Sequence, residues 1–399
     1  MPSASERDER PAILYISYNG IGGALARSQV LPYLRALDGP MRFDVLAFDG
    51  GAEALPPARE LGSVRVHRLS YRRGPRLVAK LFDLIVGTVT AVGIVRASDI
   101  RLIHARSHVA ATIAAVTGAI TGRPFIFDMR GFFGDERAEA GSIGAGGILH
   151  RALATAERLL LTHAAAVVVL TERARERLLS LQQYASAVRG KPIVVVPCCV
   201  DLGRFGTRDQ RVQRLVYLGS VGTWYRLDAM LRFFEHFRAL RPGATFVVAN
   251  QSQHELVRAA VAGTSAGDAV LVRSVPFEEV PALLETCAAG LVLLSEGGSK
   301  VASSPIKVAE YLAAGLPVVA NAIVGDVPEL LRAGRAGIVL EDLGDPELRR
   351  GARELVALLE EGPELHARAR RLAGDAFDVR EGARRYGLLY DELLRGSGA

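Results

Sequence analysis

Residues 303–317 read SSPIKVAEYLAAGLP and run straight into the apolar segment LPVVAN at 316–321. The stretch 305–315 has the apolar spacing of a helix, whereas 316–321 is short and apolar, which is typical of a buried strand. Ser303 or Ser304 is suited to cap the helix, and the proline that follows them suits its first turn. The stretch therefore predicts a helix followed directly by a strand, the repeating unit of an α/β fold with a parallel sheet.

Short apolar strands alternate with helical patterns on both sides of this stretch. The polar segment 201–213, which carries two glycines, interrupts the alternation and predicts a domain boundary at 205/206. We therefore predict an α/β protein with two Rossmann-like domains that face each other across a cleft, because open parallel sheets bind ligands outside the carboxyl ends of their strands. The predicted strands are 12–18, 43–48, 64–69, 102–106, 125–131, 166–171 and 193–201 in the first half, and 214–220, 245–250, 269–275, 289–295, 316–321 and 336–340 in the second.

Composition places the chain among soluble globular enzymes. Its 399 residues are 49% hydrophobic and 23% charged, enough for two cores without disulfide bonds. The three cysteines lack the spacing of zinc ligands and are interpreted as packing residues in a reducing compartment. The N-terminus has no apolar signal core, and the apolar run 81–95, with Asp83 inside, is too short to span a bilayer. We expect a cytoplasmic protein that can touch the inner face of the membrane.

Six cations cluster within a short segment of the first half. A solvated face is one interpretation, and a patch that meets anionic phosphates of a membrane surface or a lipid-linked acceptor is the other. A nucleic-acid surface is disfavoured, because aromatic residues make up only 6% of the chain and the cluster lacks a set of interleaved aromatics for stacking, with Tyr71 alone among its cations. The cluster consists of Arg65, Arg68, Arg72, Arg73, Arg76 and Lys80.

Lys307 is a candidate catalytic and donor-binding residue of the predicted helix, and Glu310 is a candidate donor-binding residue. Free amide groups and the positive end of the dipole make a helix N-terminus an anion site. A cation such as Lys307 is unfavourable in a first turn unless an anion is bound, which favours a diphosphate ligand. Glu310 lies near the same face and can accept two hydroxyl groups, as a ribose presents them.

The first half carries two weaker signals at predicted strand ends. Gly22 and Gly23 follow the first strand, where glycines let a phosphate or sugar approach the backbone, although the pattern is not a dinucleotide fingerprint. Asp128 and Arg130 follow the strand at 125–131, so we take Asp128 as a candidate base and Arg130 as a group that can stabilise charge. Asp135 and Glu136 are further candidates for acceptor binding, and His104 also ends a strand.

The stretch 303–317 resembles the donor-binding signature of retaining GT-B glycosyltransferases of family 4. Those enzymes usually carry two glutamates separated by seven residues, followed by a segment like AAGLPVVA. Here Glu310 matches the second glutamate, but the first falls on Ala302. Many bacterial polysaccharide transferases share the S-x-P-x-K variant found here, in which Ser303, Ser304 and Lys307 can substitute for the missing glutamate.

The resemblance extends over most of the chain. Tyr217 to Arg226 is similar to a strand and loop whose two cations grip the donor diphosphate, with Ser220 in place of the first and Arg226 at the second. The loop with Glu329 matches one that lies near the nucleotide. The family often places a histidine where this chain has Arg130. The last helix, from about Phe377, fits a family habit of crossing back onto the first domain.

The resemblance implies a glycosyltransferase that moves a sugar from a nucleotide-diphosphate donor to a glycan or lipid-linked acceptor with retention of configuration. It implies an acceptor-side domain at 1–205, a donor domain at 206–375 and the returning helix at 376–399. No Asp-x-Asp motif for Mg²⁺ follows a predicted strand, so we expect neither metal nor cofactor. An epimerase of the same fold and a non-catalytic nucleotide-sugar-binding protein remain alternatives, and no nucleic acid partner is expected.

Overall fold

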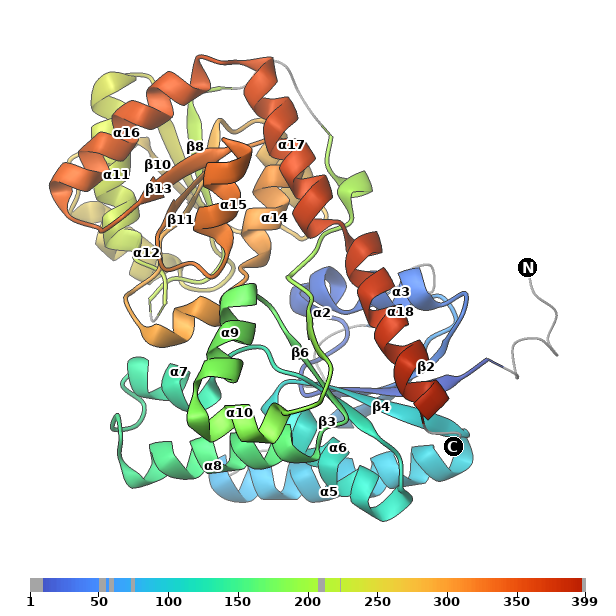
Figure 1. The fold of residues 1–399 in the computed structure, drawn as a ribbon. Helices are drawn as coiled ribbons and strands as arrows, with labels where there is room; N and C mark the ends of the chain where they lie inside the picture. The colour runs from blue at the N-terminus through green and yellow to red at the C-terminus, as the bar shows by residue number, and fades with distance from the viewer. Residues whose placement is uncertain are drawn as a thin grey trace. The chain divides into compact units, whose positions relative to one another are not determined.

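The computed structural model describes residues 10–49, 55–56, 61–72, 76–206, 212–222 and 224–396. The chain divides into two compact units, which are considered one at a time. Unit 1 consists of Met1–Pro197 together with Val379–Ala399, and unit 2 of Cys198–Asp378. The last helix is thus part of the first unit, although the sequence of the second unit separates it from the rest of unit 1 (Figure 1).

Unit 1 is built on a parallel sheet of seven strands in the order β3-β2-β1-β4-β5-β6-β7. The inner strands β1, β2 and β4 to β6 are almost wholly buried, as their apolar sequences predict, whereas β3 is partly exposed at the edge. Their bounds are β1 (Ala12–Ser17), β2 (Arg42–Asp49), β3 (Arg65–Ser70), β4 (Ile100–Arg106), β5 (Phe125–Asp128), β6 (Ala166–Val169) and β7 (Ile193–Val195).

Helices cover both faces of this sheet, because right-handed crossovers change face where the strand order reverses between β1 and β4. One layer holds α5 (Arg76–Ala97), α6 (His108–Thr121) and α8 (Ile148–His163), and the other face holds α3 (Leu31–Leu37) and α18 (Val379–Gly396) (Figure 1). The remaining helices are α2 (Ala24–Gln29), α7 (Phe133–Glu139), α9 (Glu172–Ser180) and α10 (Gln182–Val188).

Unit 2 repeats the plan with six parallel strands in the order β10-β9-β8-β11-β12-β13. Apolar side chains form one core cluster on each face of this sheet. The strands are β8 (Arg214–Leu218), β9 (Thr245–Ala249), β10 (Val270–Arg273), β11 (Ala289–Val292), β12 (Val318–Asn321) and β13 (Gly337–Leu340). The prediction of an α/β fold with two Rossmann-like domains is confirmed.

The helices of unit 2 divide between its two cores. Helices α11 (Leu227–Leu240), α12 (His254–Ala262) and α16 (Asp345–Leu359) line one core, and α13 (Val280–Glu285), α14 (Ile306–Ala313), α15 (Val327–Gly334) and α17 (Pro363–Phe377) line the other. Short 3-10 turns are η1 (Leu202–Arg204), η2 (Gly267–Ala269) and η3 (Gly298–Ala302).

Two sequence predictions differ from the fold in length. The predicted strand 193–201 pairs only over Ile193–Val195, and Val200 instead forms an isolated bridge with Asp378. The apolar run 81–95 is the centre of the longer helix α5. Within the part of the chain that the structure describes, Val78–Ala97 is the one segment whose length and composition would suffice to cross a membrane, and about a third of it is buried inside unit 1.

Candidate active site

The carboxyl end of β8 lies where the strand order of unit 2 reverses. Strand β8 pairs with β9 on one side and β11 on the other, and the helices that follow β8 and β11 cover opposite faces. Parallel sheets bind ligands in the crevice at such a switch point. The sequence-predicted residues Ser220, Arg226, Lys307 and Glu310 all come from the segments that follow these two strands.

Two amide side chains hold the loop that follows β8. Gly219 and Gly222 have φ angles of +119° and +113°, which side chains other than glycine rarely adopt. Between them, Val221 donates its N–H to Gln253 Oε1 at 2.8 Å and accepts from Gln253 Nε2 at 2.9 Å. Asn250 Nδ2 donates to the carbonyl of Gly219 at 3.0 Å. The backbone of this loop is therefore fixed without a ligand.

Helix α14 is fastened to β8 by Tyr311. The Tyr311 hydroxyl accepts the N–H of Leu218 at 2.9 Å, and both groups are buried. The Tyr311 ring lies so close to Gly290 of β11 that any Cβ there would overlap it. These contacts place the stretch 303–317 beside the loop after β8, so the two predicted parts of the site are brought together.

The ammonium group of Lys307 is buried beside Gly219. Its Nζ lies 3.2 Å from the Tyr217 hydroxyl and 3.5 Å from the centre of the Tyr225 ring. A Cβ at Gly219 would come within 3.1 Å of Nζ. Burial lowers the pKa of Lys307 well below its usual value, although Glu310 opposes the shift. In such surroundings an arriving anion strongly favours the charged form of the lysine.

Glu310 lies one turn further along α14 and is 7% exposed. Burial raises its pKa to about 7, against the opposing charges of Arg204 and Lys307. Among the residues that the structure describes, none donates a hydrogen bond to its carboxylate. The group therefore ionises near neutral pH and can accept hydroxyl groups of a ligand.

Neither serine caps α14. The helix begins at Ile306 with Pro305 at the N-cap position, and no side chain there bonds a free amide of the first turn. Ser304 Oγ instead accepts the N–H of Cys198 at 3.1 Å, while Ser303 is half-buried. The capping prediction is wrong because Ser304 joins α14 to the start of unit 2. The amide of Val308 donates to the carbonyl of Pro305 at 2.9 Å, and no side chain caps the first turn.

The other predicted donor residues lie closer to solvent. Arg226 occupies the N-cap position of α11 and donates to both carboxylate oxygens of Asp228 at 2.8 and 2.7 Å, with its side chain 40% exposed. Ser220 is exposed and its carbonyl accepts the Tyr217 hydroxyl. Glu329 is exposed in the first turn of α15. Asp228 occupies Nε and Nη2 of this arginine, so an arriving anion would compete with Asp228 for them.

Sequence reasoning missed Lys300 and Trp224. Lys300 lies in η3, just before α14, and is 2% exposed. Its Nζ lies 3.9 Å from the centre of the Trp224 ring, in the loop after β8. The one signal in the sequence that could have pointed to Trp224 as a site residue is its position, because this single tryptophan of the chain follows a glycine turn at the end of a predicted strand. A second buried cation therefore accompanies Lys307 in unit 2.

A separate polar cluster lies at the strand ends of unit 1. Asp128, which is 1% exposed, contacts Arg130 Nη1 at 3.2 Å and His104 Nε2 at 3.4 Å. From α18, the Tyr386 hydroxyl donates to Asp128 at 3.3 Å and the Tyr390 hydroxyl lies 2.8 Å from His104 Nδ1. Because a carboxylate only accepts, Nε2 carries the histidine proton and Nδ1 accepts from Tyr390.

This cluster keeps Asp128 ionised. Burial alone would raise its pKa, but Arg130, His104 and Arg106 outweigh burial and hold the pKa of Asp128 well below its usual range. A carboxylate stabilised in this way is a weak proton acceptor. The geometry therefore suits Asp128 for positioning Arg130 better than for the predicted role of a base. Arg130 is in turn tied to Gln29 Oε1 at 3.2 Å.

The remaining predicted residues of unit 1 have structural contacts. Gly22 and Gly23 are half-buried before α2, and neither needs a left-handed backbone. Asp135 pairs with Arg177 and with His150 Nε2, at 2.5 and 2.8 Å, and Glu136 lies in the first turn of α7. Asp135 is therefore engaged inside unit 1.

The predicted basic cluster is partly neutralised. Arg68 pairs with Asp49 at 2.5 Å and Arg65 lies 3.7 Å from Asp44. Arg72 lies over the Phe82 ring at 4.3 Å, and Lys80 lies over a tyrosine ring. Arg73 and the side chain of Arg76 lie outside the described residues. The two cations nearest α5 are thus the ones available to a partner.

No three His, Cys, Asp or Glu side chains in the described part of the chain gather closely enough to hold a metal ion. Independence from metals stays a prediction. The three cysteines are free and buried.

Comparisons with known proteins agree with this geometry. Residues 7–199 match the family model of the glycosyl transferase 4-like domain, and residues 212–360 match that of glycosyl transferases group 1. No curated protein matches the sequence. Among solved structures, sucrose-phosphate synthase from Thermosynechococcus elongatus is similar over 97% of this chain and 100% of its own, with a TM-score of 0.76 and 15% identity.

Two further structures share the fold. A glycosyltransferase from Rickettsia africae has a TM-score of 0.72 and 13% identity over 97% of this chain and 99% of its own. HepE from Anabaena, in complex with UDP and glucose, has a TM-score of 0.69 and 14% identity over 95% and 99% of the two chains. The two family models cover both units, and the fold matches throughout. The chain therefore belongs to the GT-B glycosyltransferases of the GT4 type.

Proposed function

We propose that this glycosyltransferase binds the diphosphate of its nucleotide-sugar donor between the Gly219–Gly222 loop and the start of α14. The observation that carries the proposal is the buried Lys307, whose Nζ lies 3.2 Å from a phenol oxygen and beside Gly219, a residue with no side chain to crowd it. The start of α14, which no side chain caps, adds to the attraction for an anion.

The reaction moves a glycosyl group between two oxygens. The bond between the anomeric carbon and the diphosphate oxygen breaks, a bond to an acceptor hydroxyl oxygen forms, and the departing diphosphate takes up the hydroxyl proton. In this proposal Lys307 and the loop amides stabilise the departing diphosphate, and Glu310 accepts ribose hydroxyls. Arg226 contributes a further cation after leaving Asp228, while Ser220, Ser303, Ser304 and Glu329 line the donor site. Retention of configuration is proposed from the family resemblance.

Unit 1 is proposed to carry the acceptor. The ion pair with the buried Asp128 holds Arg130 at the carboxyl end of β5, where acceptors can approach the sheet. Gly22 and Gly23 follow β1, which is separated from β5 by β4. We propose a glycan or lipid-linked acceptor, as in polysaccharide or glycolipid synthesis. The protein would work in the cytoplasm, with peripheral contact to the inner membrane surface.

The test is release of nucleoside diphosphate from a panel of nucleotide sugars, with and without a lipid extract. UDP-glucose is the first donor to use, because it is bound in one of the similar structures. Acceptor-dependent release by the wild type, lost in Lys307→Met, is the expected result. Release that is unchanged in this variant would remove Lys307 from the donor site. An isomerised donor without release would instead indicate an epimerase, and binding without turnover a non-catalytic protein.

A further inference from the structure

The outward side of α5 in unit 1 is an apolar stripe. Val78, Leu81, Phe82, Ile85 and Val89 follow one another at helical spacing, and each is between 40% and 68% exposed. From residue 81 to 95 the only charged side chain is Asp83, which is buried on the opposite side of the helix. Such a stripe is larger than the scattered apolar residues of an ordinary surface.

The inward side of α5 is firmly part of unit 1. Asp83 accepts the Tyr18 hydroxyl at 2.6 Å, and a Cβ at Gly87 would meet Ile113 of α6 at 2.7 Å and Phe48 of β2 at 2.8 Å. The helix therefore lies flat in the layer that covers the sheet. The apolar stripe of α5 can therefore lie on the surface of a bilayer. Crossing the bilayer would require α5 to give up these contacts with the sheet and with α6.

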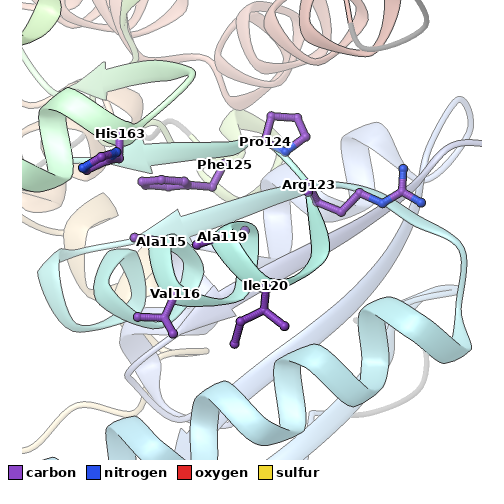
Figure 2. Close-up of a pocket in the computed structure, with 10 residues that line it drawn as sticks. Ala115, Val116, Ala119, Ile120, Arg123, Pro124, Phe125 and His163 are labelled. Carbon is purple, nitrogen blue, oxygen red and sulfur yellow. The ribbon is translucent and has the colours of Figure 1, made fainter.

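Helix α6 extends the apolar surface beside α5. The two helices pack together, α6 contains no Asp, Glu, Lys or Arg, and Val116 and Ile120 are exposed on it. Figure 2 shows these two side chains projecting from the side of α6 that faces away from Phe125. They also line a pocket of about 720 Å³ between α6 and the end of α8, with Arg123 and His163 as its ionisable residues.

Cations lie at both ends of this surface. Arg72 and Lys80 lie over aromatic rings near the start of α5, and Arg96 is exposed at its end. From Arg72 to Arg123 the sequence holds eight Lys or Arg and two Asp. Asp83 and Arg106 are buried, and Asp99 pairs with Arg101. An apolar centre with a cationic border complements an anionic lipid surface.

We propose that the exposed surface of α5 and α6, here called the α5–α6 face, binds peripherally to an anionic lipid bilayer. The inference deepens the membrane contact within the proposed function by naming the surface that makes it. A second copy of the chain is the rival occupant. In a twofold interface the same border would face itself, so its cations would repel, whereas anionic headgroups neutralise them.

The experiment compares sedimentation of the full chain with vesicles of phosphatidylcholine alone and vesicles that also contain phosphatidylglycerol. The wild type should bind the anionic vesicles about tenfold more strongly than the neutral ones, and added salt should weaken that binding. The double variant Ile85→Asp with Val89→Asp should lose at least about tenfold in binding, because charge in the stripe opposes insertion. The double variant Arg96→Glu with Arg123→Glu reverses two charges of the cationic border and leaves the apolar stripe unchanged. It should bind the anionic vesicles more weakly than the wild type does.

A matched control is Leu256→Asp with Leu271→Asp, two similarly exposed apolar positions of unit 2. These should bind vesicles as the wild type does. The proposal is overturned if the wild type and the stripe variant sediment equally with anionic vesicles. It is also overturned if analytical ultracentrifugation shows that the wild type is a dimer and the stripe variant a monomer. UDP binding, measured on the same proteins by calorimetry, should be unchanged, and its absence would count against the proposed function rather than the α5–α6 face.

Discussion

Glu310 in α14 of unit 2 and Asp128 at the end of β5 in unit 1 are both buried carboxylates, yet their pKa values shift in opposite directions. Around Asp128, burial is outweighed by Arg130, His104 and Arg106, and the pKa falls. Around Glu310, burial outweighs Arg204 and Lys307, and the pKa rises to about 7. Asp128 has its hydrogen-bond donors already in place, whereas no described residue donates to Glu310.

The difference shows that the polar contacts of Asp128 are complete within unit 1, whereas those of Lys307 and Glu310 are incomplete without a ligand. Asp128 belongs to contacts that the fold completes by itself, including two tyrosines of α18. Lys307 and Glu310 are buried at a cost in desolvation that their neighbours do not repay in full. Groups kept in this state are candidates for ligand binding, because a ligand can supply what is missing. The following changes test the contrast, from the largest expected effect to the smallest.

Replacing Lys307 with Met should weaken UDP binding about a hundredfold, because a buried cation that meets a diphosphate contributes on the order of 3 kcal/mol. The free energy of unfolding should stay the same or rise, since an uncompensated buried charge is removed. Calorimetry with UDP and urea unfolding measure the two quantities. Lys191→Met, a lysine of unit 1 that donates to backbone carbonyls, is the control and should leave UDP binding unaltered. A large loss of stability in Lys307→Met would mean that Lys307 is structural.

Replacing Asp128 with Asn should act the other way and destabilise unit 1 by about 2–3 kcal/mol, because it leaves Arg130 and His104 without their anion. UDP affinity should be unchanged, while turnover slows as Arg130 loses its fixed position. The stability that Asp128 contributes is present above its unfolded pKa of about 4 and is lost as the pH falls toward the lower folded value. Urea unfolding between about pH 3 and 7 measures it, and a variant as stable as wild type throughout would contradict the network.

Glu310 should give the opposite pH dependence. Its folded pKa is raised to about 7, so the native state binds more protons than the unfolded state and stability falls as the pH rises toward that value. Glu310→Gln should remove this fall and be about 2 kcal/mol more stable than wild type at about pH 8. UDP affinity of the wild type should rise through neutrality as the carboxylate forms, and the variant should show no such rise. Equal pH profiles for the two proteins would exclude Glu310 from ribose binding.

The candidate donor site could be predicted from the sequence more fully than the polar cluster around Asp128 in unit 1. Residues 303–317 are contiguous, so helical spacing alone places Lys307 and Glu310 near each other. Asp128, His104 and Tyr386 come from β5, β4 and α18, and their contact depends on the return of the last helix to the first sheet. The prediction that a serine caps α14 was wrong for a related reason, because Ser304 accepts a hydrogen bond from Cys198, more than a hundred residues earlier in the chain. Strands and helices followed from local patterns, whereas long-range polar contacts did not.

The smallest expected effect belongs to Gln253, which holds the loop beside Lys307 without being a proposed ligand contact. Gln253→Ala removes two hydrogen bonds to Val221, so the loop should gain freedom and UDP affinity should fall about fivefold, equivalent to about 1 kcal/mol. Gln253→Glu keeps the acceptor for the Val221 N–H, but it loses the donor and adds a negative charge beside the proposed diphosphate, so its UDP affinity should be lower than that of Gln253→Ala. Faster amide hydrogen exchange at Val221 in Gln253→Ala would distinguish a loosened loop from a lost ligand contact. If affinity fell while exchange stayed at the wild-type rate, Gln253 would itself touch the donor, and the contrast between supporting and binding residues in unit 2 would have to be redrawn.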